Sequence, residues 1–263
     1  MSDAVLVDTK AGVTTVRLNR PPLNTFDDGL RQELSEAIRP LADDDSVGAV
    51  VLAGNDRAFA AGADLKQLVT MNYEQISVWN RALQRVFTEI AQLPMPVVAA
   101  VDGYALGGGL ELALAADFRI LGANAQLALP EVQLGILPGA GGVQRLRRLV
   151  GASRAKELLM SGRRVSAEEA VDIGLAERVV PGAELLSTAQ EFAATLAGGP
   201  RFALRAIKEA VDLGEDSSLA AGLALDRNLL AGLFATADRE IGMASFLEHG
   251  PGRATFGRGE ESA

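Results

Sequence analysis

The chain has 263 residues, of which 48% are apolar and 22% charged, so it is long and apolar enough to bury a large core. Acidic residues exceed basic ones, 34 against 25, and the net charge of −9 argues against nucleic acid as a partner. The chain lacks Cys and has one His, His249, which excludes thiol nucleophiles and metal sites built from several His or Cys ligands. Catalysis would have to use mainly carboxylates, backbone amides, hydroxyls, Lys, Arg or Tyr.

The N-terminal segment Met1–Val5 has an early acid and no long apolar run, which is not typical of a signal peptide. The strongest uninterrupted apolar stretch, Val97–Val101, is too short to span a bilayer, which argues against a membrane protein. The lack of Cys fits a reducing compartment. We therefore expect a cytoplasmic protein.

The first forty residues predict a hairpin followed by a helix. Residues 5–7 and 13–18 are rich in β-branched side chains and flank Lys10-Ala11-Gly12, a pattern typical of two strands joined by a tight turn. Apolar residues then recur at helical spacing as far as Leu41, and the acids at 27 and 28 can cap the start of that helix.

The next sixty residues predict two buried strands with a helix between them. Residues 47–52 and 97–101 are short apolar runs that loops bound, as in buried strands. Between them, an apolar stripe at helical spacing predicts a helix that Pro94 and Pro96 end. The members of that stripe are Trp79, Leu83, Val86, Phe87 and Ile90.

The C-terminal part of the chain is predicted to be helical. A capping box at Ser166–Glu169 begins a short helix that Gly174 ends. After Gly198-Gly199-Pro200 no strand-like run follows, and apolar residues fall at helical spacing. We therefore divide the chain into a core, residues 1–198, and a helical region, residues 199–263. That region is small and Ala-rich, so we expect it to pack on the core or on another subunit.

Two segments of small side chains follow predicted buried strands, at Ala58–Leu65 and at Gly103–Glu111. Such loops leave backbone N–H groups free to face a ligand, and a helix that starts there adds positive potential. Two N–H groups that converge from separate loops can stabilise a developing oxyanion. The alternative is that the glycines only allow close packing of helix on strand, and the spacing alone favours that alternative.

Two acids stand in apolar surroundings close to these loops. Glu111 follows three glycines at the start of an apolar run, and Glu131 follows Pro130 at the start of another. An isolated acid near a helix N-terminus is usually solvated and stabilised by the helix dipole. Two such acids beside two candidate N–H donors favour catalysis instead, because paired carboxylates can divide the acid and base roles.

Three segments, Ala58–Leu65, Gly103–Glu111 and Leu129–Gly142, together resemble the enoyl-CoA hydratase/isomerase (crotonase) superfamily. The flanking segments Leu18–Pro21 and Phe234–Glu240 extend the resemblance over nearly the whole chain. It implies an α/β fold, with a crotonase-like spiral ββα core for acyl-CoA binding and catalysis and a C-terminal α-helical trimerisation region. It further implies acyl-CoA thioester substrates and a homotrimer, or a homohexamer built as a dimer of trimers.

Position by position, the resemblance assigns an oxyanion hole to the backbone amides of Ala63 and Gly108. It assigns catalytic carboxylates to Glu111 and Glu131. Relatives that add water across a 2-enoyl thioester have both glutamates, whereas many isomerases, hydrolases and decarboxylases of the family lack one or both. The residues implied to line the passage for CoA are Ala61, Asp64, Leu65 and Lys66.

The resemblance therefore implies an enoyl-CoA hydratase, which adds water reversibly to a 2-trans-enoyl-CoA and gives a 3-hydroxyacyl-CoA in fatty-acid or related acyl-CoA catabolism. It implies that Glu131 exchanges the proton at C2 while Glu111 holds and activates the water. It implies no metal and no cofactor, because coenzyme A enters as part of the thioester substrate. The alternatives are another crotonase-fold reaction on an acyl-CoA, such as a double-bond isomerisation or a specialised pathway step, and a non-catalytic trimer that binds CoA esters.

Two segments depart from the commoner family pattern. Arg20–Asn24 is shorter and has Pro where Lys or Arg is frequent, so one expected cation toward CoA is missing. Glu248–Gly252 replaces a more basic pattern, and we expect His249 within it to be a surface or helix-end residue. Tyr73 and Trp79 lie where relatives shape the acyl pocket, although the apolar stripe that contains Trp79 favours a place in the core.

Overall fold

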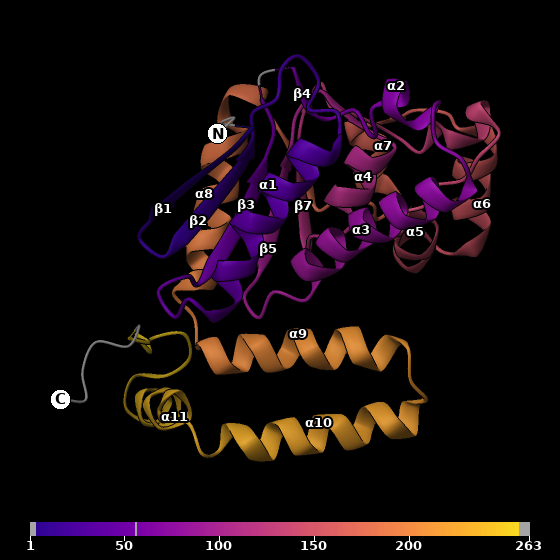
Figure 1. Cartoon of the computed structure of the whole chain (residues 1–263). Coiled ribbons are helices and arrows are strands. Elements are labelled where there is room, and N and C mark those ends of the chain that lie inside the picture. The colour runs from indigo at the N-terminus through magenta and orange to yellow at the C-terminus, as the bar shows by residue number, and fades with distance from the viewer. Residues whose placement is uncertain (1–3, 56, 258–263) are drawn as a thin grey trace.

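The structure is a computed structural model of the chain, and it describes residues 4–55 and 57–257. Met1–Asp3, at the start of the N-terminal segment considered above, lie outside these residues. Two sheets and the helices around them form a core, and the helices that follow residue 200 lie beneath that core in the view of Figure 1.

The larger sheet has six strands in the order β1-β2-β3-β5-β7-β10. The predicted hairpin is confirmed, because β1 and β2 pair antiparallel, and every later pair in this sheet is parallel. Strands β3 and β5 are buried along their whole length, as in parallel strands that are covered on both faces. The strands are Val5–Lys10 (β1), Val13–Leu18 (β2), Ala49–Ala53 (β3), Val97–Val101 (β5), Phe118–Gly122 (β7) and Arg178–Val180 (β10).

A second sheet of four strands, in the order β4-β6-β8-β9, was not predicted. Strands β4, β6 and β8 each follow a strand of the larger sheet and lead toward a helix, and this is the ββα succession that the resemblance implies. The predicted α/β class is therefore confirmed. Strands of two or three residues beside glycines have the sequence pattern of loops, which is why they were missed. They are Ala58–Ala60 (β4), Tyr104–Leu106 (β6), Gln126–Ala128 (β8) and Val165–Ser166 (β9).

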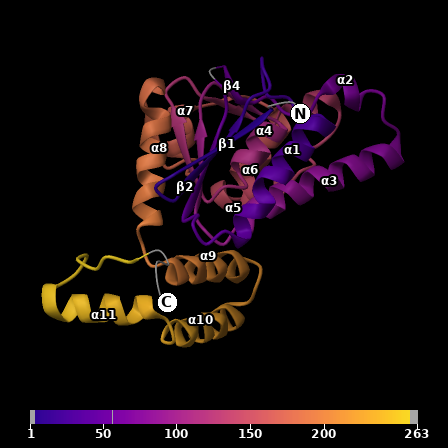
Figure 2. The ribbon, with the colours of Figure 1, turned by 60° about the vertical axis from the view of Figure 1, so that its left-hand side comes forward.

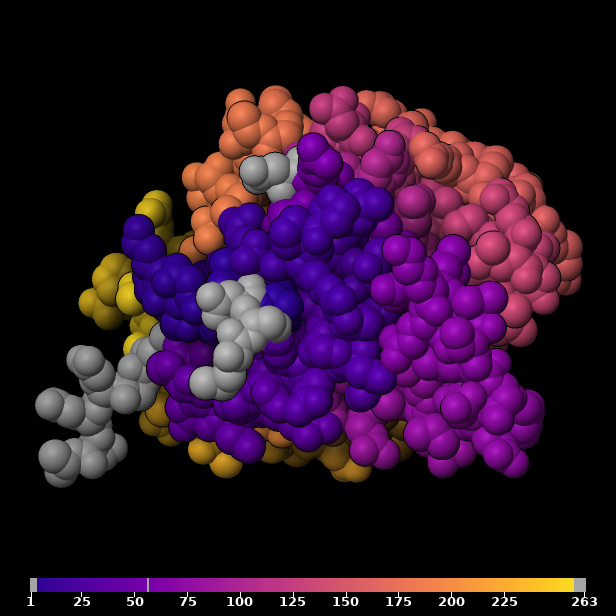
Figure 3. Space-filling model, turned by 45° about the horizontal axis from the view of Figure 1, so that its top comes forward, coloured from indigo at the N-terminus to yellow at the C-terminus, as the bar shows by residue number. Residues whose placement is uncertain are grey.

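Helices cover both faces of the larger sheet (Figure 2). On one face α8 (Gly182–Ala197) packs small side chains against alternate residues of β3, β5 and β7. On the other face α1 (Asp28–Ile38) and α3 (Tyr73–Ala91) contribute large apolar side chains to the main core. Figure 3 shows the indigo N-terminal residues over the centre of one face, with orange α8 on one side and purple α2 and α3 on the other.

The first helix is shorter than predicted. It ends at Ile38, and a 3-10 turn, η1 (Arg39–Asp43), continues the chain past Pro40, because proline cannot donate the next backbone hydrogen bond. The third helix fits the prediction, since the predicted stripe is buried and the helix ends before Pro94.

Short helices connect the strands of the two sheets. They are α2 (Leu65–Leu68), α4 (Gly108–Ala113), η2 (Pro130–Leu134), α5 (Gly142–Val150), α6 (Ala152–Ser161) and α7 (Ala167–Asp172). The capping box predicted for α7 is half formed. The Ser166 side chain accepts a hydrogen bond from the Glu169 N–H, whereas the Glu169 carboxylate pairs with Arg163 instead of returning to the cap.

The predicted C-terminal helices are confirmed as α9 (Arg201–Glu215), α10 (Leu219–Leu233) and α11 (Ala237–His249). Figure 1 shows α9 and α10 as an antiparallel pair beneath the core. Lys208 on α9 pairs with Asp117 of the core at 2.8 Å, and Arg148 on α5 pairs with Glu215 at 3.2 Å. His249 is the last residue of α11 and is exposed, as expected. The division at residues 198 and 199 into two domains stays a prediction.

The helices after residue 200 bury few of their large apolar side chains. Those that remain exposed are Phe202, Ile207, Val211, Leu213, Leu219, Leu223, Leu230, Phe234, Ile241, Met243, Phe246 and Leu247. Within residues 4–55 and 57–257, no single helix is long and apolar enough to cross a membrane; only α10 and α11 taken together, across an 81° bend, reach that length and composition.

A glycine decides how closely α4 approaches β4. A Cβ atom on Gly109 would overlap the carbonyl oxygen of Ala60, so Gly109→Ala must push the helix away from the strand. We expect this substitution to lower the free energy of unfolding by about 1–3 kcal/mol or more, the usual effect of overpacking a core, measured by thermal or urea unfolding.

The matched control is Gly29→Ala in α1, where a Cβ would meet only Asp27 Oδ1 at 3.4 Å. This control should leave the stability unchanged or raise it slightly, because alanine has less conformational freedom than glycine in the unfolded chain. Equal unfolding temperatures for Gly109→Ala and the wild type would contradict the packing described for α4.

Candidate active site

Two backbone segments touch at the N-terminus of α4. A Cβ atom on Gly62 would lie 2.9 Å from the Leu106 carbonyl oxygen and 3.3 Å from the Gly108 nitrogen. In the same way, a Cβ on Gly108 would lie 3.8 Å from the Ala63 nitrogen. Gly62 also has a positive φ of 87°, which glycine adopts without strain. The structure therefore brings the predicted amides of Ala63 and Gly108 close together.

Neighbouring hydrogen bonds hold each of these amides in place without using its N–H group. Phe26 bonds to the residues on both sides of Ala63, at 2.8 and 2.9 Å, and the Gly107 N–H donates to Ala128 of β8 at 2.9 Å. Across the described part of the chain, no oxygen accepts a hydrogen bond from the N–H of Ala63 or Gly108. Both N–H groups are thus available to one small acceptor.

Glu111 lies one turn into α4 and is only 3% exposed. Its Oε1 atom accepts hydrogen bonds from the Ala140 N–H at 2.7 Å and from the Gly142 N–H, at the start of α5, at 2.8 Å. Burial raises the pKa of Glu111, and these two bonds together with the charge of Arg145 oppose that rise. Because Oε1 makes both bonds, Oε2 is left to reach a ligand.

Glu131 lies in the first turn of η2, and its carboxylate faces the loop before α4. Its Oε1 atom is only 2.7 Å from where a Cβ on Gly107 would stand, and Gly107 has a positive φ of 51°, which favours glycine. Its Oε2 atom is buried and has no hydrogen-bond partner among the described residues. Burial, and secondarily the charge of Glu111, raise the pKa of Glu131 to about 7. The two predicted glutamates therefore do lie together, and they differ in their surroundings.

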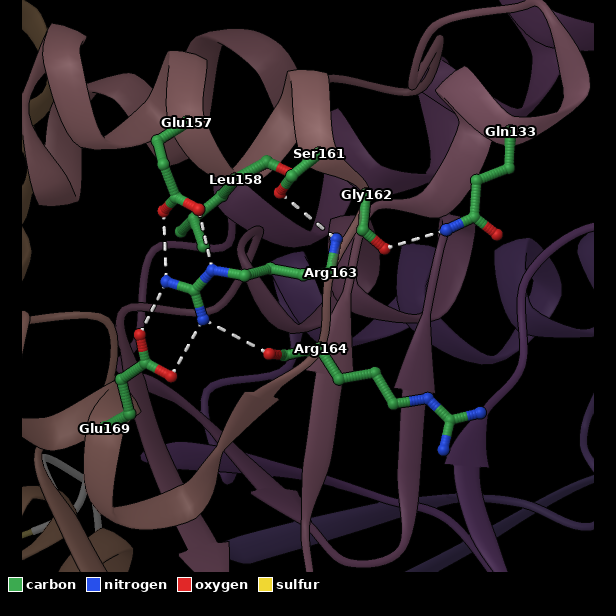
Figure 4. Close-up of polar contacts among 8 residues, drawn as sticks. All are labelled: Gln133, Glu157, Leu158, Ser161, Gly162, Arg163, Arg164 and Glu169. Atoms are coloured by element: carbon green, nitrogen blue, oxygen red, sulfur yellow. Dashed lines mark hydrogen bonds and ion pairs between the residues drawn. The ribbon is translucent and has the colours of Figure 1, made fainter.

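The helix η2 rests on the end of α6, and an arginine fixes that end (Figure 4). The Gln133 side chain donates to the Gly162 carbonyl at 3.3 Å, and a Cβ on Gly162 would contact η2. Arg163 lies between the carboxylates of Glu157 on α6 and Glu169 on α7, with hydrogen bonds of 2.7–3.0 Å to each. This cluster ties α6 to α7 and so supports the element that presents Glu131.

The residues predicted to line the CoA passage lie on the segment that runs outward from Ala63. The Asp64 side chain caps α2 by accepting the Lys66 N–H at 2.9 Å, and the side chains of Leu65 and Lys66 are exposed. The Ala61 N–H donates to the Leu23 carbonyl at 2.9 Å. Their contact with CoA stays a prediction.

The aromatic residues that the resemblance places near the acyl pocket have different surroundings. Tyr73 is exposed at the start of α3, whereas Trp79 is 7% exposed and belongs to the main core, as its stripe predicts. Arg20, in the segment that departs from the family pattern, forms an ion pair with Asp27.

The sequence did not predict the buried residue that holds β4, the strand before the loop that contains Ala63. Asn24 is fully buried, and its side-chain amide donates to the carbonyls of Ala58 at 3.0 Å and Phe59 at 2.9 Å. It therefore fixes β4, the strand that leads to Ala63. Asn is one of the few residues that tolerate the positive φ of 52° found here, so the sequence does indicate a turn at this position. A turn after two prolines does not, however, predict a hydrogen-bond partner 34 residues away.

The family model for enoyl-CoA hydratase/isomerase matches residues 8–255. The chain belongs to this family. The mitochondrial enoyl-CoA hydratase of Pongo abelii is 40% identical over 237 residues, which cover 90% of this chain and 81% of the relative. The crystal structure of an enoyl-CoA hydratase from Bacillus anthracis has 40% identity and a TM-score of 0.93, covering 98% of this chain and 100% of that one. The structure of Pseudomonas aeruginosa DspI has 34% identity and a TM-score of 0.93, covering 98% and 97%.

The raised pKa of Glu131 predicts a stability that depends on pH. The unfolded carboxyl ionises near 4.5, whereas the folded one ionises at about 7, so between these values the folded chain holds the extra proton and stability falls as pH rises. Glu131→Gln lacks this effect. We expect it to match the wild type at pH 4 and to be more stable at pH 8 by about 1–3 kcal/mol, since the side chain keeps some solvent contact.

The measurement is urea unfolding of both proteins at the two pH values. As a control, Glu191→Gln makes the same substitution at an exposed position of α8 and measures the general effect of replacing a surface glutamate. A Glu131→Gln variant that is less stable than the wild type at pH 8 would contradict the described burial of this carboxyl.

Proposed function

We propose that this member of the family is an enoyl-CoA hydratase, which adds water reversibly to a 2-trans-enoyl-CoA and gives a 3-hydroxyacyl-CoA. One observation carries the proposal: a buried glutamate, Glu111, and a half-buried one, Glu131, lie at the same helix terminus as two backbone N–H groups that have no acceptor among the described residues. A protein that only bound CoA esters would have no use for two carboxylates whose burial is unfavourable.

The thioester carbonyl oxygen accepts hydrogen bonds from the N–H groups of Ala63 and Gly108. As water attacks C3, the electrons of the C2–C3 double bond move toward this oxygen, and the two N–H groups stabilise the enolate charge that develops. The N-terminus of α4 adds positive potential in the same direction. Transition-state stabilisation is therefore supplied by backbone groups that the fold has already oriented.

The glutamates exchange the two protons of the reaction. Glu111 starts as the carboxylate, which its two N–H donors favour, and takes a proton from the attacking water. Glu131, with its pKa raised to about 7, starts protonated and gives its proton to C2. A proton passed from Glu111 to Glu131 through solvent restores the starting state. The two carboxyls titrate as a coupled pair, so these assignments describe the main route.

We propose an acyl-CoA thioester as the substrate, in keeping with the family to which the chain belongs. Ala61, Asp64, Leu65 and Lys66 would guide the CoA portion along the segment that leads outward from the oxyanion hole. Water, two carboxyls and two amides account for every atom and proton of the reaction, so we propose no metal and no cofactor other than the CoA of the substrate.

The glutamates provide the direct test. Glu111→Gln and Glu131→Gln keep the side-chain volume and remove the exchangeable proton, so each should lower kcat by roughly 10²–10⁴. Because the pair acts as a unit, the double variant should lose far less than the product of the single losses. The assay follows the loss of the conjugated thioester absorbance with 2-enoyl-CoAs of several chain lengths.

Folded Gln variants should still bind a saturated acyl-CoA, which separates loss of chemistry from loss of binding. Near wild-type turnover by either folded single variant would show that its glutamate is not catalytic. If the wild type hydrates no 2-enoyl-CoA of any length but binds CoA esters, the chain performs another reaction of its family or serves only to bind.

We also propose that the chain assembles as a homotrimer, or as a homohexamer of two trimers. The exposed apolar side chains of α9, α10 and α11 support this, because monomeric proteins rarely leave so many on one region. We expect light scattering at micromolar concentration to give the mass of three or six chains. A monomer would contradict the proposal. A cytoplasmic location and a role in fatty-acid or related acyl-CoA catabolism stay predictions.

A further inference from the structure

The carbonyl of Gly139 receives two side-chain hydrogen bonds from α3. Asn80 Nδ2 donates to it at 3.0 Å and Gln84 Nε2 at 2.6 Å. The two amides are four residues apart, so they lie on one face of the helix, above one another. A Cβ on Gly139 would lie 2.6 Å from Asn80 Oδ1, so this glycine leaves the room that the amide occupies.

The same peptide unit holds Glu111 from its other side. The Gly139 carbonyl and the Ala140 N–H belong to one planar group, and that N–H donates to Glu111 Oε1 at 2.7 Å. Donors on the carbonyl therefore fix the direction in which the N–H points. They also polarise the peptide and strengthen the N–H as a donor.

The loop from residue 139 to residue 142 needs such an anchor because three of its four residues are glycines. Gly141 has a φ of +119°, and glycines leave the backbone many alternative conformations. Arg145 holds the loop at the next carbonyl, that of Ala140, at 3.2 Å. Among the described residues, only Asn80 and Gln84 of α3 donate to the carbonyl of the peptide group whose N–H forms the 2.7 Å bond to Glu111.

We propose that Asn80 and Gln84 are positioning residues for Glu111, acting through the Gly139–Ala140 peptide. Both side chains donate to the Gly139 carbonyl and not to the carboxylate. They set the orientation and donor strength of the Ala140 N–H, one of the groups that favour the ionised form of Glu111. This deepens the proposed function, on which the kinetic part of the test rests.

Loss of either amide weakens the Ala140 N–H bond to Glu111. Since that bond favours the ionised carboxylate, the pKa of Glu111 rises when the bond weakens. As the pH is lowered, Glu111 is then protonated, and inactive as a base, at a higher pH than in the wild type. The acidic limb of the kcat profile therefore moves to higher pH. Binding of the acyl-CoA is unchanged, because the two amides of the oxyanion hole are not involved.

The test uses Gln84→Met and Asn80→Leu, which keep the approximate side-chain size and remove the donor, singly and together. We expect kcat to fall roughly 3–10-fold for each single variant and roughly 10–100-fold for the double, the scale of one and two hydrogen bonds. KM should change by less than about twofold, as for an interaction used in the transition state. Gln84→Lys, which keeps a donor, should restore most of the rate.

Gln92→Met is the matched control, because it is the same substitution at an exposed position at the end of α3. It should leave kcat, KM and the pH profile unchanged. If Asn80→Leu does not fold, the exposed Gln84 alone decides the outcome. A folded Gln84→Met variant with wild-type kcat and pH profile would overturn the proposal, and so would a lower kcat with an unmoved acidic limb.

A second readout does not depend on any activity. Carbon-13 NMR of glutamate carboxyls, with Glu111 assigned through Glu111→Gln, gives its pKa directly in the wild type and in Gln84→Met. We expect a higher pKa in the variant. An unchanged pKa would overturn the positioning role even if hydration is observed. A shifted pKa in a protein that hydrates no enoyl-CoA would leave the positioning role standing and reject the proposed function alone.

Discussion

The structure of the site depends on the close approach of α4 to the loop after β4. No Cβ fits on Gly109 against β4 or, without strain, on Gly62 against β6, so only glycines let these segments come into contact. This contact brings the backbone amides of Ala63 and Gly108, the proposed oxyanion hole, close together. The next residues of α4 then direct Glu111 to the same place. Two backbone donors and one carboxylate are thus positioned by a single packing constraint.

Two carboxyl groups lie together here, Glu111 buried and Glu131 half-buried, and two negative charges so placed are unfavourable unless one carboxyl is protonated. The surroundings decide which one. Glu111 accepts two backbone N–H bonds and faces the charge of Arg145, whereas no residue in the described part of the chain donates to the buried Oε2 of Glu131. The donors favour the ionised form of Glu111, which can accept a proton, whereas burial favours the protonated form of Glu131, which can give one.

The sequence predicts those parts whose causes are local. The strand β5, the stripe on α3 and the capped start of α1 follow from apolar spacing and caps, and the two glutamates were recognised by acids within apolar runs and by the motifs around them. The second sheet was missed because strands as short as β4 have no period to detect. The bonds from Asn80 to Gly139 and from Gln133 to Gly162 join residues 59 and 29 positions apart, and nothing in either segment indicates the other.

These distant bonds show that residues outside the site determine its geometry. The helix α5 is the clearest case, because its first residue, Gly142, donates to Glu111 while Arg148 near its end pairs with Glu215 of α9. A helix of nine residues is stiff, so the position of α9 and that of Glu111 are linked through it. The C-terminal helices leave apolar side chains exposed, and the proposed assembly would cover them and fix α9. The proposed assembly and the proposed catalysis would therefore depend on the same short helix, α5.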